Sequence, residues 1–534
     1  MILYKNCRII TMSENMPTAN YMVVEDGRIT GIGTGDAPKQ FDTEKFSEII
    51  DLNGNTVIPG FWESHLHIVD GTRNLIELNL RGCNDLDSMR HRLAEYRETL
   101  SEGDWIIGHG WDEKYLFNGS FPDRQLLDGL CREQPMMLIR MDGHSLCINT
   151  RAMELLGSDW IVPSPEVPMG EDGLPTGMVY ENAANNLTDR VSEKLSDDYL
   201  EKIVLKAQQL FVENGISSVN DICTAKPRYF DMYQKLYGEG KLKIRITASA
   251  NASEPGSVQA FEDRRRSETS KLKIGSPKCF MDGSFGSRTA LLFEEYSDEP
   301  GNCGLELIER GELARLIADN AEHGRAINIH AIGDKAVANI LDAYEKTDID
   351  FRSRNIRGRI EHIQVIRKED IKRFRDWNIT ASFQPVFLYE KELTAERLGK
   401  DRLDRVYLFK TFMDCGVNVV LNSDWPYGGG EFPQKPGGSV YIGFEPLLGL
   451  HSACCNQFNS SEELEPLDAL KGYTINPAYV NHREAELGKL EKGYLADFVV
   501  LSRNISEGSP QDMIDTEVLM TVVNGEILYA KITG

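Results

Sequence analysis

Apolar and polar positions follow a β-type pattern at both ends of the chain. Short runs rich in β-branched and aromatic residues alternate there with turn signals. The runs are residues 2–12, 21–33, 56–60, 496–501 and 518–529. Glu25-Asp26-Gly27 and Asn524-Gly525 have the composition of tight hairpin turns. Because short strands cannot bury their faces alone, we expect residues 1–58 and 485–534 to join in one small β-sandwich domain.

Between the ends, strand-like apolar runs alternate with helical stretches, which is typical of a parallel sheet with crossover helices. Eight runs end in polar residues, namely 61–68, 215–222, 244–250, 277–284, 326–333, 357–364, 379–385 and 417–426. Eight is the count of a closed (β/α)8 TIM barrel, so we expect an α/β fold with this barrel over residues 59–484. About 150 residues separate the first two runs, more than one crossover needs, which predicts an inserted α/β subdomain at approximately 75–200.

Metal-ligand residue types stand on five of the eight runs. His65 and His67 are two residues apart, so their side chains point to the same face of the first strand. Alone, such a pair is more often structural than metal-binding. Only ten histidines occur in the chain, however, and four stand at the ends of three predicted strands. Barrel enzymes build their sites from the carboxyl ends of strands, which favours a metal site. The candidate ligands are His65, His67, Lys278, His330, His362 and Asp424.

The order H-x-H, Lys, His, His, Asp along strands one, four, five, six and eight resembles the amidohydrolase superfamily. KCFMDGSFGSRTA, INIHAIGDKAV, RIEHIQ, SFQP and NSDWP resemble more narrowly the branch that includes N-substituted formamide deformylase, amidohydrolase family 3, also called YtcJ-like. GHGWDE, DGHSLCINTRAM, LPTGMVYENA and GKLEKGYLADFVVL resemble that branch too, so the resemblance covers nearly the whole chain.

The resemblance implies a role for each candidate ligand. His65, His67 and Asp424 would hold a first divalent metal ion. His330 and His362 would hold a second ion or complete a single site. Lys278, if carboxylated on its amine, would bridge two ions; the alternative is an uncarboxylated Lys278 paired with Asp282 or with substrate. Imidazole and carboxylate ligands without thiolate suit zinc, and also manganese, cobalt or iron(II).

These roles imply a metal-dependent hydrolase that cleaves a carbon–nitrogen bond of a small molecule, such as an amide, formamide or cyclic amide, by a metal-activated hydroxide. Asp424 would take the proton of the attacking water and return it to the leaving nitrogen. One fold hosts many chemistries, so ester hydrolysis, deamination and decarboxylation stay open, as does a non-catalytic, metal-binding or regulatory relative.

Four further residues are candidates for substrate binding. The resemblance places His144 and Glu181, both in the predicted insertion, at the pocket. Arg288 follows a glycine-rich loop, where a guanidinium could bind a substrate carboxylate or carbonyl. Trp425, together with Phe280, Phe285 and Tyr427, could form an aromatic pocket, although aromatic residues at strand ends more often serve packing.

Composition narrows the partners and the compartment. Lys and Arg total 59 against 83 Asp and Glu, and the resulting net charge of −24 argues against nucleic acid or a membrane surface as partner. The cysteines are scattered without a C-x-x-C pair, and the first residues lack a signal-peptide pattern, so we expect a cytoplasmic protein with reduced thiols. A homodimer is the commonest assembly for such an enzyme and is our expectation.

Overall fold

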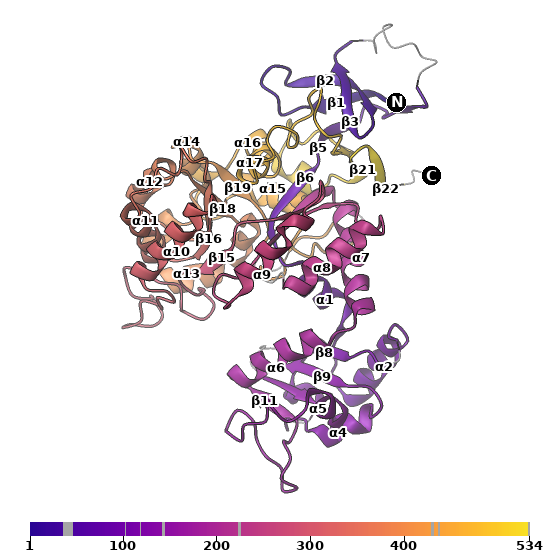
Figure 1. The fold of residues 1–534 in the computed structure, drawn as a ribbon, viewed down its shortest axis with the longest axis vertical. Helices are drawn as coiled ribbons and strands as arrows, with labels where there is room; N and C mark the ends of the chain where they lie inside the picture. The colour runs from indigo at the N-terminus through magenta and orange to yellow at the C-terminus, as the bar shows by residue number, and fades with distance from the viewer. Residues whose placement is uncertain are drawn as a thin grey trace. The chain divides into compact units, whose positions relative to one another are not determined.

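The computed structural model describes residues 1–35, 46–101, 103–117, 119–140, 145–222, 226–428, 432–435 and 438–531 (Figure 1). It divides into two compact units, one of Met1–Ile68 with Ala207–Gly534 and one of Val69–Lys206. No helix within the described ranges is long and apolar enough to cross a membrane. The cysteines within them are all free thiols.

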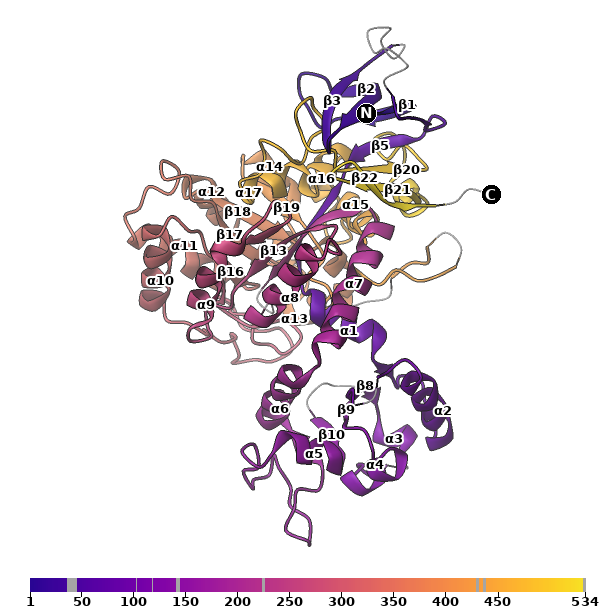
Figure 2. The same ribbon diagram turned by 45° about the vertical axis from the view of Figure 1, so that its right-hand side comes forward.

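Strands from both chain ends form one sheet in the larger unit (Figures 1 and 2, indigo and yellow). They are β1 (Ile2–Ile10), β2 (Thr18–Glu25), β3 (Arg28–Gly33), β4 (Glu48–Asp51), β5 (Thr56–Pro59), β20 (Phe498–Leu501), β21 (Val518–Val523) and β22 (Glu526–Ala530). The order is β22-β21-β20-β5-β1-β2-β3, with β4 beside β1. The two chain ends meet where β20 pairs antiparallel with β5. Tyr4, Val57 and Phe498 are fully buried in the core of this sheet.

Both hairpin turns predicted from the sequence are confirmed. Asp26 and Gly27 connect β2 and β3 with φ values of 51° and 77°. Asn524 and Gly525 connect β21 and β22 with φ values of 54° and 75°. Positive φ at both central residues defines a type I′ turn, which glycine and asparagine-like residues adopt at the lowest steric cost.

Each of the eight predicted barrel runs contains a strand, and these strands form two parallel sheets. The eight strands are β6 (Phe61–Leu66), β12 (Ile216–Ile222), β13 (Arg245–Ser249), β15 (Lys278–Phe280), β16 (Asn328–Ala331), β17 (Gly358–His362), β18 (Ile379–Phe383) and β19 (Val419–Leu421), and a ninth strand, β14 (Leu272–Ile274), joins them. One sheet has the order β14-β13-β12-β6 and the other β15-β16-β17-β18-β19. The sequence pattern does not predict β14, which is separated from β15 by a segment containing Pro277. Proline lacks the N–H that a strand needs for its ladder.

Backbone hydrogen bonds join the two sheets at two seams. At one seam the N–H of His67 donates to the carbonyl of Trp425 at 2.9 Å. The N–H of Asp424 donates to the carbonyl of His65 at 2.8 Å. At the other seam the backbone of Lys278 bonds to the segment that follows β13. The fold is therefore of the TIM-barrel type, but its strands lie in two sheets joined by isolated bridges and not in the single closed ring that we expected.

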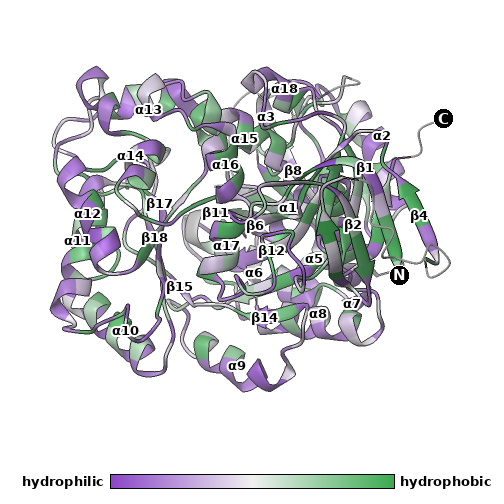
Figure 3. Cartoon of the chain, turned by 90° about the horizontal axis from the view of Figure 1, so that it is seen from above, coloured by the Kyte–Doolittle hydropathy of each residue, from purple (hydrophilic) through white to green (hydrophobic). Residues whose placement is uncertain are grey.

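Helices connect and follow the strands of the larger unit. They are α8 (Pro227–Gly238), α9 (Ser257–Arg264), α10 (Arg310–Glu322), α11 (Asp334–Lys346), α12 (Ile371–Asp376), α13 (Lys391–Leu398) and α14 (Phe409–Asp414), followed by α15 (Pro446–Cys454), α16 (Pro466–Gly472), α17 (Ile475–Val480) and α18 (Pro510–Ile514). Short 3-10 helices are η2 (Arg265–Ser267), η3 (Lys368–Asp370), η4 (Pro385–Glu390), η5 (Lys400–Arg405) and η6 (Ser460–Glu462). Figure 3 shows that α10 to α13 carry both hydrophilic and hydrophobic residues. In α11, nine of the 13 residues are buried, Val337, Leu341 and Tyr344 among them, so this helix is covered on most of its sides.

The smaller unit is built on a five-stranded mixed sheet with the order β11-β10-β9-β8-β7. Its elements are β7 (Leu78–Asn79), α2 (Leu86–Arg97), β8 (Ile106–Trp111), α3 (Glu113–Leu116), α4 (Arg124–Leu130), β9 (Met136–Arg140), β10 (Ser145–Ile148), α5 (Thr150–Leu156), β11 (Met178–Tyr180) and α6 (Glu181–Lys194). Helices α1 (Ile68–Ile76) and α7 (Asp197–Glu213) contain the points where the chain passes between the units. Trp111 and Met136 are fully buried in the core of the smaller unit. Asp85, Asp123 and Asn149 cap the first turns of α2, α4 and α5 by accepting backbone hydrogen bonds.

Candidate metal centre

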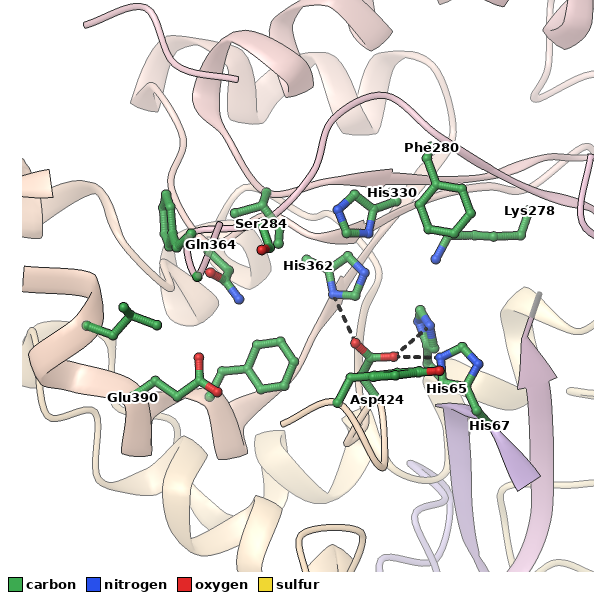
Figure 4. A pocket seen from close by; sticks show the side chains of 16 residues that line it. His65, His67, Lys278, Phe280, Ser284, His330, His362, Gln364, Glu390 and Asp424 are labelled. Atoms are coloured by element: carbon green, nitrogen blue, oxygen red, sulfur yellow. Dashed lines mark hydrogen bonds and ion pairs between the residues drawn. The ribbon is translucent and has the colours of Figure 1, made fainter. Parts of the chain in front are cut away.

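Two histidines at the end of β6 and one aspartate after β19 form a buried cluster (Figure 4). His65 and His67 lie two residues apart, so both imidazoles reach the same side of the chain. Nε2 of His65 is 3.1 Å and Nε2 of His67 is 3.0 Å from Oδ1 of Asp424. One nitrogen or oxygen from each residue lies within 4.8 Å of the other two. Three converging donors of these types form the arrangement expected of a metal site.

A turn in the backbone brings Asp424 to this cluster. Its φ of 57° lies in the left-handed region, which aspartate tolerates better than most residues. Burial raises the pKa of the Asp424 carboxyl, but His65, His67 and His362 around it lower that pKa well below its usual range. The carboxylate is therefore charged at neutral pH, which is the form that binds a metal ion.

The imidazole of His65 is oriented by a carboxylate behind it. Its Nδ1 lies 2.9 Å from Oε2 of Glu361, and Glu361 in turn forms an ion pair with Arg359 at 3.0 Å. Burial raises the pKa of Glu361, but Arg359 and His65 lower it well below its usual range, so a charged Glu361 accepts a hydrogen bond from Nδ1–H. This hydrogen bond leaves a lone pair on the buried Nε2, so the approach of Nε2 to Oδ1 of Asp424 at 3.1 Å is a contact of two acceptors and not a hydrogen bond. A metal ion could bind this lone pair, since histidines that ligate a metal usually donate the N–H of their other ring nitrogen to such a carboxylate.

His362, at the end of β17, is fixed in a similar way by an amide. Its Nδ1 lies 2.9 Å from Oε1 of Gln384, whose Nε2 donates to Oδ1 of Asn422 at 2.7 Å. Because the amide nitrogen of Gln384 is already engaged, its oxygen accepts from Nδ1–H and the Nε2 lone pair of His362 is left for a ligand. Burial, the neighbouring His330 and Lys278 hold the pKa of His362 well below its usual range, so the ring is neutral.

His330, at the end of β16, completes the set of histidines. Its ring centroid is 4.4 Å from that of His362, and its Nε2 lies 2.9 Å from the carbonyl of Gly283. A carbonyl only accepts, so Nε2 carries the proton and Nδ1 is the potential ligand atom. Burial and the charge of Lys278 lower the pKa of His330 to about 3, and a neutral imidazole is the form that coordinates metals.

These side chains lie in a cavity of about 500 Å³, a volume suited to a small organic substrate. All six predicted ligands line it. The remaining walls are mainly aromatic and aliphatic, with Ser284, Gln364 and Glu390 as polar members; the wall residues are Phe280, Phe285, Gly286, Ile332, Phe387, Leu393 and Tyr427. The structure thus places the candidate ligands in one apolar cavity.

Comparison with known proteins agrees with this geometry. Residues 48–529 match the sequence model described as the amidohydrolase family. The chain belongs to this family. Membership supports hydrolysis as the class of reaction, and the His65, His67 and Asp424 cluster supports a divalent metal.

This amidohydrolase is 29% identical to the putative amidohydrolase YtcJ of Bacillus subtilis, over 98% of each chain. It is 24% identical to the N-substituted formamide deformylase of Arthrobacter pascens, also over 98% of each chain. The crystal structure of an uncharacterized metal-dependent hydrolase from Pyrococcus horikoshii superimposes with a TM-score of 0.79 at 26% identity, covering 96% of this chain and 99% of that one. The resemblance predicted from the motifs is confirmed.

Lys278, on β15, is buried and points its amine toward the histidines (Figure 4). Its Nζ lies 5.2 Å from the ring centroid of Phe280 and forms no hydrogen bond or ion pair with the residues that the structure describes. Asp282, the partner that we considered, instead accepts the backbone N–H groups of Leu291 at 2.8 Å and Gly333 at 2.9 Å. Burial raises the pKa of Asp282 to about 7. Within this amidohydrolase the amine of Lys278 therefore faces the cavity, and no carboxylate of the described residues pairs with it.

The predicted substrate-binding residues have different positions. Arg288 pairs with Asp298 at 2.8 Å and is not among the residues that line the cavity. Trp425 is buried in contact with Phe444, at 5.1 Å between ring centroids, and also lies outside the lining. His144 and the side chain of Glu181 lie outside the described residues.

Sequence reasoning missed the residues that orient the ligands and one polar wall residue. They are Glu361, Gln364 and Gln384. Glu361 lies in β17, the strand that carries His362, and Gln364 follows that strand. Gln384 follows the next strand, β18. Gln364 stands two residues after His362, so the same period of two that identified the histidine pair could have indicated it.

Proposed function

We propose that this amidohydrolase is a metal-dependent hydrolase that cleaves a carbon–nitrogen bond in a small-molecule amide, formamide or cyclic amide. The convergence of ligand atoms from His65, His67 and Asp424 on one point in an apolar cavity carries the proposal. Family membership supports it, as do relatives named as a formamide deformylase and a metal-dependent hydrolase.

The donor set fits one or two divalent ions. His65, His67 and Asp424 would hold the first ion, while His330 and His362 would hold a second or complete one site. Nitrogen and carboxylate donors without thiolate suit zinc. Lys278 could be carboxylated: its neutral amine would add to carbon dioxide and release a proton. The product is an anionic carbamate that can bind a metal ion, whereas the ammonium form repels one. The buried, cavity-facing amine supports this modification.

A bound divalent ion polarises a substrate carbonyl and makes a coordinated water easier to deprotonate. Asp424 would receive that proton. Its Oδ1 contacts both His65 and His67, whereas Oδ2 lies 3.8 Å from Nδ1 of His362, beyond hydrogen-bonding distance. Oδ2 can therefore accept a proton from water and deliver it to the leaving nitrogen. The aromatic walls hold the substrate and exclude bulk water from the reacting atoms.

The test combines metal analysis with a substrate screen. Protein purified without added metal is analysed for transition metals and assayed against N-formyl, N-acyl and cyclic amides, with and without a chelator. We expect one to two equivalents of metal and chelator-sensitive amide cleavage. Asp424→Asn should lose activity, whereas His91→Ala, which removes an exposed imidazole, should keep it. Full activity of Asp424→Asn, or amide cleavage that no chelator reduces, would contradict the proposal.

A further inference from the structure

Gln364 is a buried polar side chain in the wall of the cavity. Its relative exposure is 4%, and its side-chain amide forms no hydrogen bond with the residues that the structure describes. Its amide atoms are not among the fully buried atoms that lack a partner, so the amide is reached from the cavity, where it can offer both its donor and its acceptor to a ligand. A ligand in the cavity could form the hydrogen bonds that the Gln364 amide lacks.

A second glutamine gives an internal comparison. Gln384 follows β18 as Gln364 follows β17, and it is buried to a similar degree. Both ends of its amide are engaged, since its oxygen is 2.9 Å from His362 and its nitrogen 2.7 Å from Asn422. The amide of Gln384 thus forms its hydrogen bonds within the protein, whereas the amide of Gln364 faces the cavity.

The backbone around Gln364 is held firmly. His362 and Ile363 have φ values of 79° and 46°, and a β-branched residue in this region is rare. The N–H of Ile363 donates to Ala331 at 2.9 Å, and the carbonyl of Gln364 accepts from Tyr407 at 3.2 Å. These bonds fix the turn, so the glutamine side chain starts from a defined position, as a binding residue requires.

The surroundings of Gln364 indicate what kind of ligand it faces. Phe285, Phe387 and Leu393 line the same cavity, and Figure 4 shows Gln364 on the side of His362 away from His65 and His67. Aromatic walls favour an apolar, flat body, and a carboxamide offers one acceptor and two donors. A substrate that satisfies both features is an amide that carries an aromatic group.

We propose that Gln364 is a substrate-binding residue that hydrogen-bonds the amide of an aromatic amide substrate, while the apolar walls hold its ring. The proposal rests on the proposed function and gives it a substrate class. Hydrogen bonding to the amide and apolar contact with the ring are separable, so each can be removed alone.

Two fluorinated probes separate these contributions. 4-Fluoroacetanilide has an aromatic ring and an amide, whereas 4-fluoroanisole has the ring without the amide. Binding of both is measured by fluorine NMR to the full chain, as purified and after chelation. The same spectra report any released 4-fluoroaniline, so hydrolysis and binding are read separately.

We expect Gln364→Leu to weaken 4-fluoroacetanilide binding by about threefold to tenfold, the effect of one lost hydrogen bond, and to leave 4-fluoroanisole binding unchanged or tighter. Phe387→Leu, a cavity-wall control, should weaken both probes together. Equal effects of Gln364→Leu on the two probes, no effect on either, or no binding of 4-fluoroacetanilide to the wild-type chain would overturn the proposal. Selective loss of binding without any released 4-fluoroaniline would uphold the role of Gln364 and count against hydrolysis of this substrate.

Discussion

Glu361 accepts a hydrogen bond of 2.9 Å from Nδ1 of His65, across 296 residues of sequence. Both side chains are fully buried, and Arg359 holds the carboxylate from the other side. The contact fixes the tautomer of His65 and aims Nε2 at Asp424, so part of the candidate metal centre is set by a residue that does not line the cavity.

Glu361→Gln should therefore weaken metal binding. The amide keeps the shape of the side chain but lacks the charge that makes Nδ1–H a strong donor, and it leaves Arg359 without its full counter-charge. We expect zinc affinity to fall by about tenfold to a hundredfold, as for other residues that orient a ligand histidine. Competition with a chromophoric chelator measures the zinc dissociation constant. Glu369→Gln, at an exposed ion pair, is the matched control; an equal constant in both variants would show that Glu361 does not act through His65.

The ion pair of Arg245 and Asp497 links β13 to the segment before β20. Nε of Arg245 is 2.7 Å from one carboxylate oxygen and Nη2 is 2.9 Å from the other, and both side chains are nearly fully buried. Asp497→Ala leaves the buried guanidinium with its hydrogen bond to the carbonyl of Ser270 but without its carboxylate partner, so we expect a loss of about 3–5 kcal/mol in the free energy of unfolding. Urea denaturation followed by circular dichroism measures it. Lys410→Ala, at an exposed pair with Asp414, should cost less than about 1 kcal/mol. Comparable losses in the two variants would contradict the expected dependence on burial.

Gly333, just before α11, must lack a side chain because the backbone of Leu291 lies close to it. A Cβ at this position would lie 2.0 Å from the carbonyl oxygen of Leu291, although the φ of Gly333 is an ordinary −82°. Gly333→Ala must therefore displace the 290–293 segment, in which the N–H of Leu291 donates to Asp282 and the N–H of Phe293 donates to Asp334 at the start of α11. We expect a loss of at least about 2 kcal/mol in stability and reduced turnover. Gly238→Ala, at the end of α8 with open space around it, should unfold at the wild-type urea concentration. Wild-type unfolding of Gly333→Ala would show that the loop moves aside freely.

The sequence predicts the strands and the candidate ligands well because both depend on local signals. The period of two that pairs His65 with His67, and the position of His362 and Asp424 after apolar runs, can be read from a few residues. The contact of Glu361 with His65 cannot be read in this way, since β17 and β6 belong to different sheets and no periodicity relates them. The same holds for the engaged amide of Gln384, whose role depends on partners contributed by two other strands.

The departures from the expected barrel have local causes that the apolar pattern hides. An apolar run of residues 277–284 suggests one long strand, yet only Lys278–Phe280 pairs as β15. Pro277 cannot donate to a ladder, and Gly283 makes room for the Thr289 side chain, to which an added Cβ would come within 2.0 Å. Residue type also misleads at two positions. Arg288 and Trp425 were candidates for substrate binding, but Arg288 forms an ion pair with Asp298 and Trp425 packs against Phe444.

Metal removal should lower the thermal stability of the chain through the histidine and aspartate cluster. A ligand that binds only the folded state stabilises it, by about 2.7 kcal/mol when its free concentration is about a hundred times its dissociation constant. We therefore expect a chelator to lower the Tm of the wild-type chain in differential scanning calorimetry, and added zinc to restore it. His67→Ala removes one converging donor and should show a much smaller response to chelator and zinc. His323→Ala, which alters an exposed histidine bonded to the carbonyl of Asp319, should respond like wild type. If His67→Ala gained as much from zinc as the wild-type chain does, the stabilising ion would be bound at residues other than His65, His67 and Asp424.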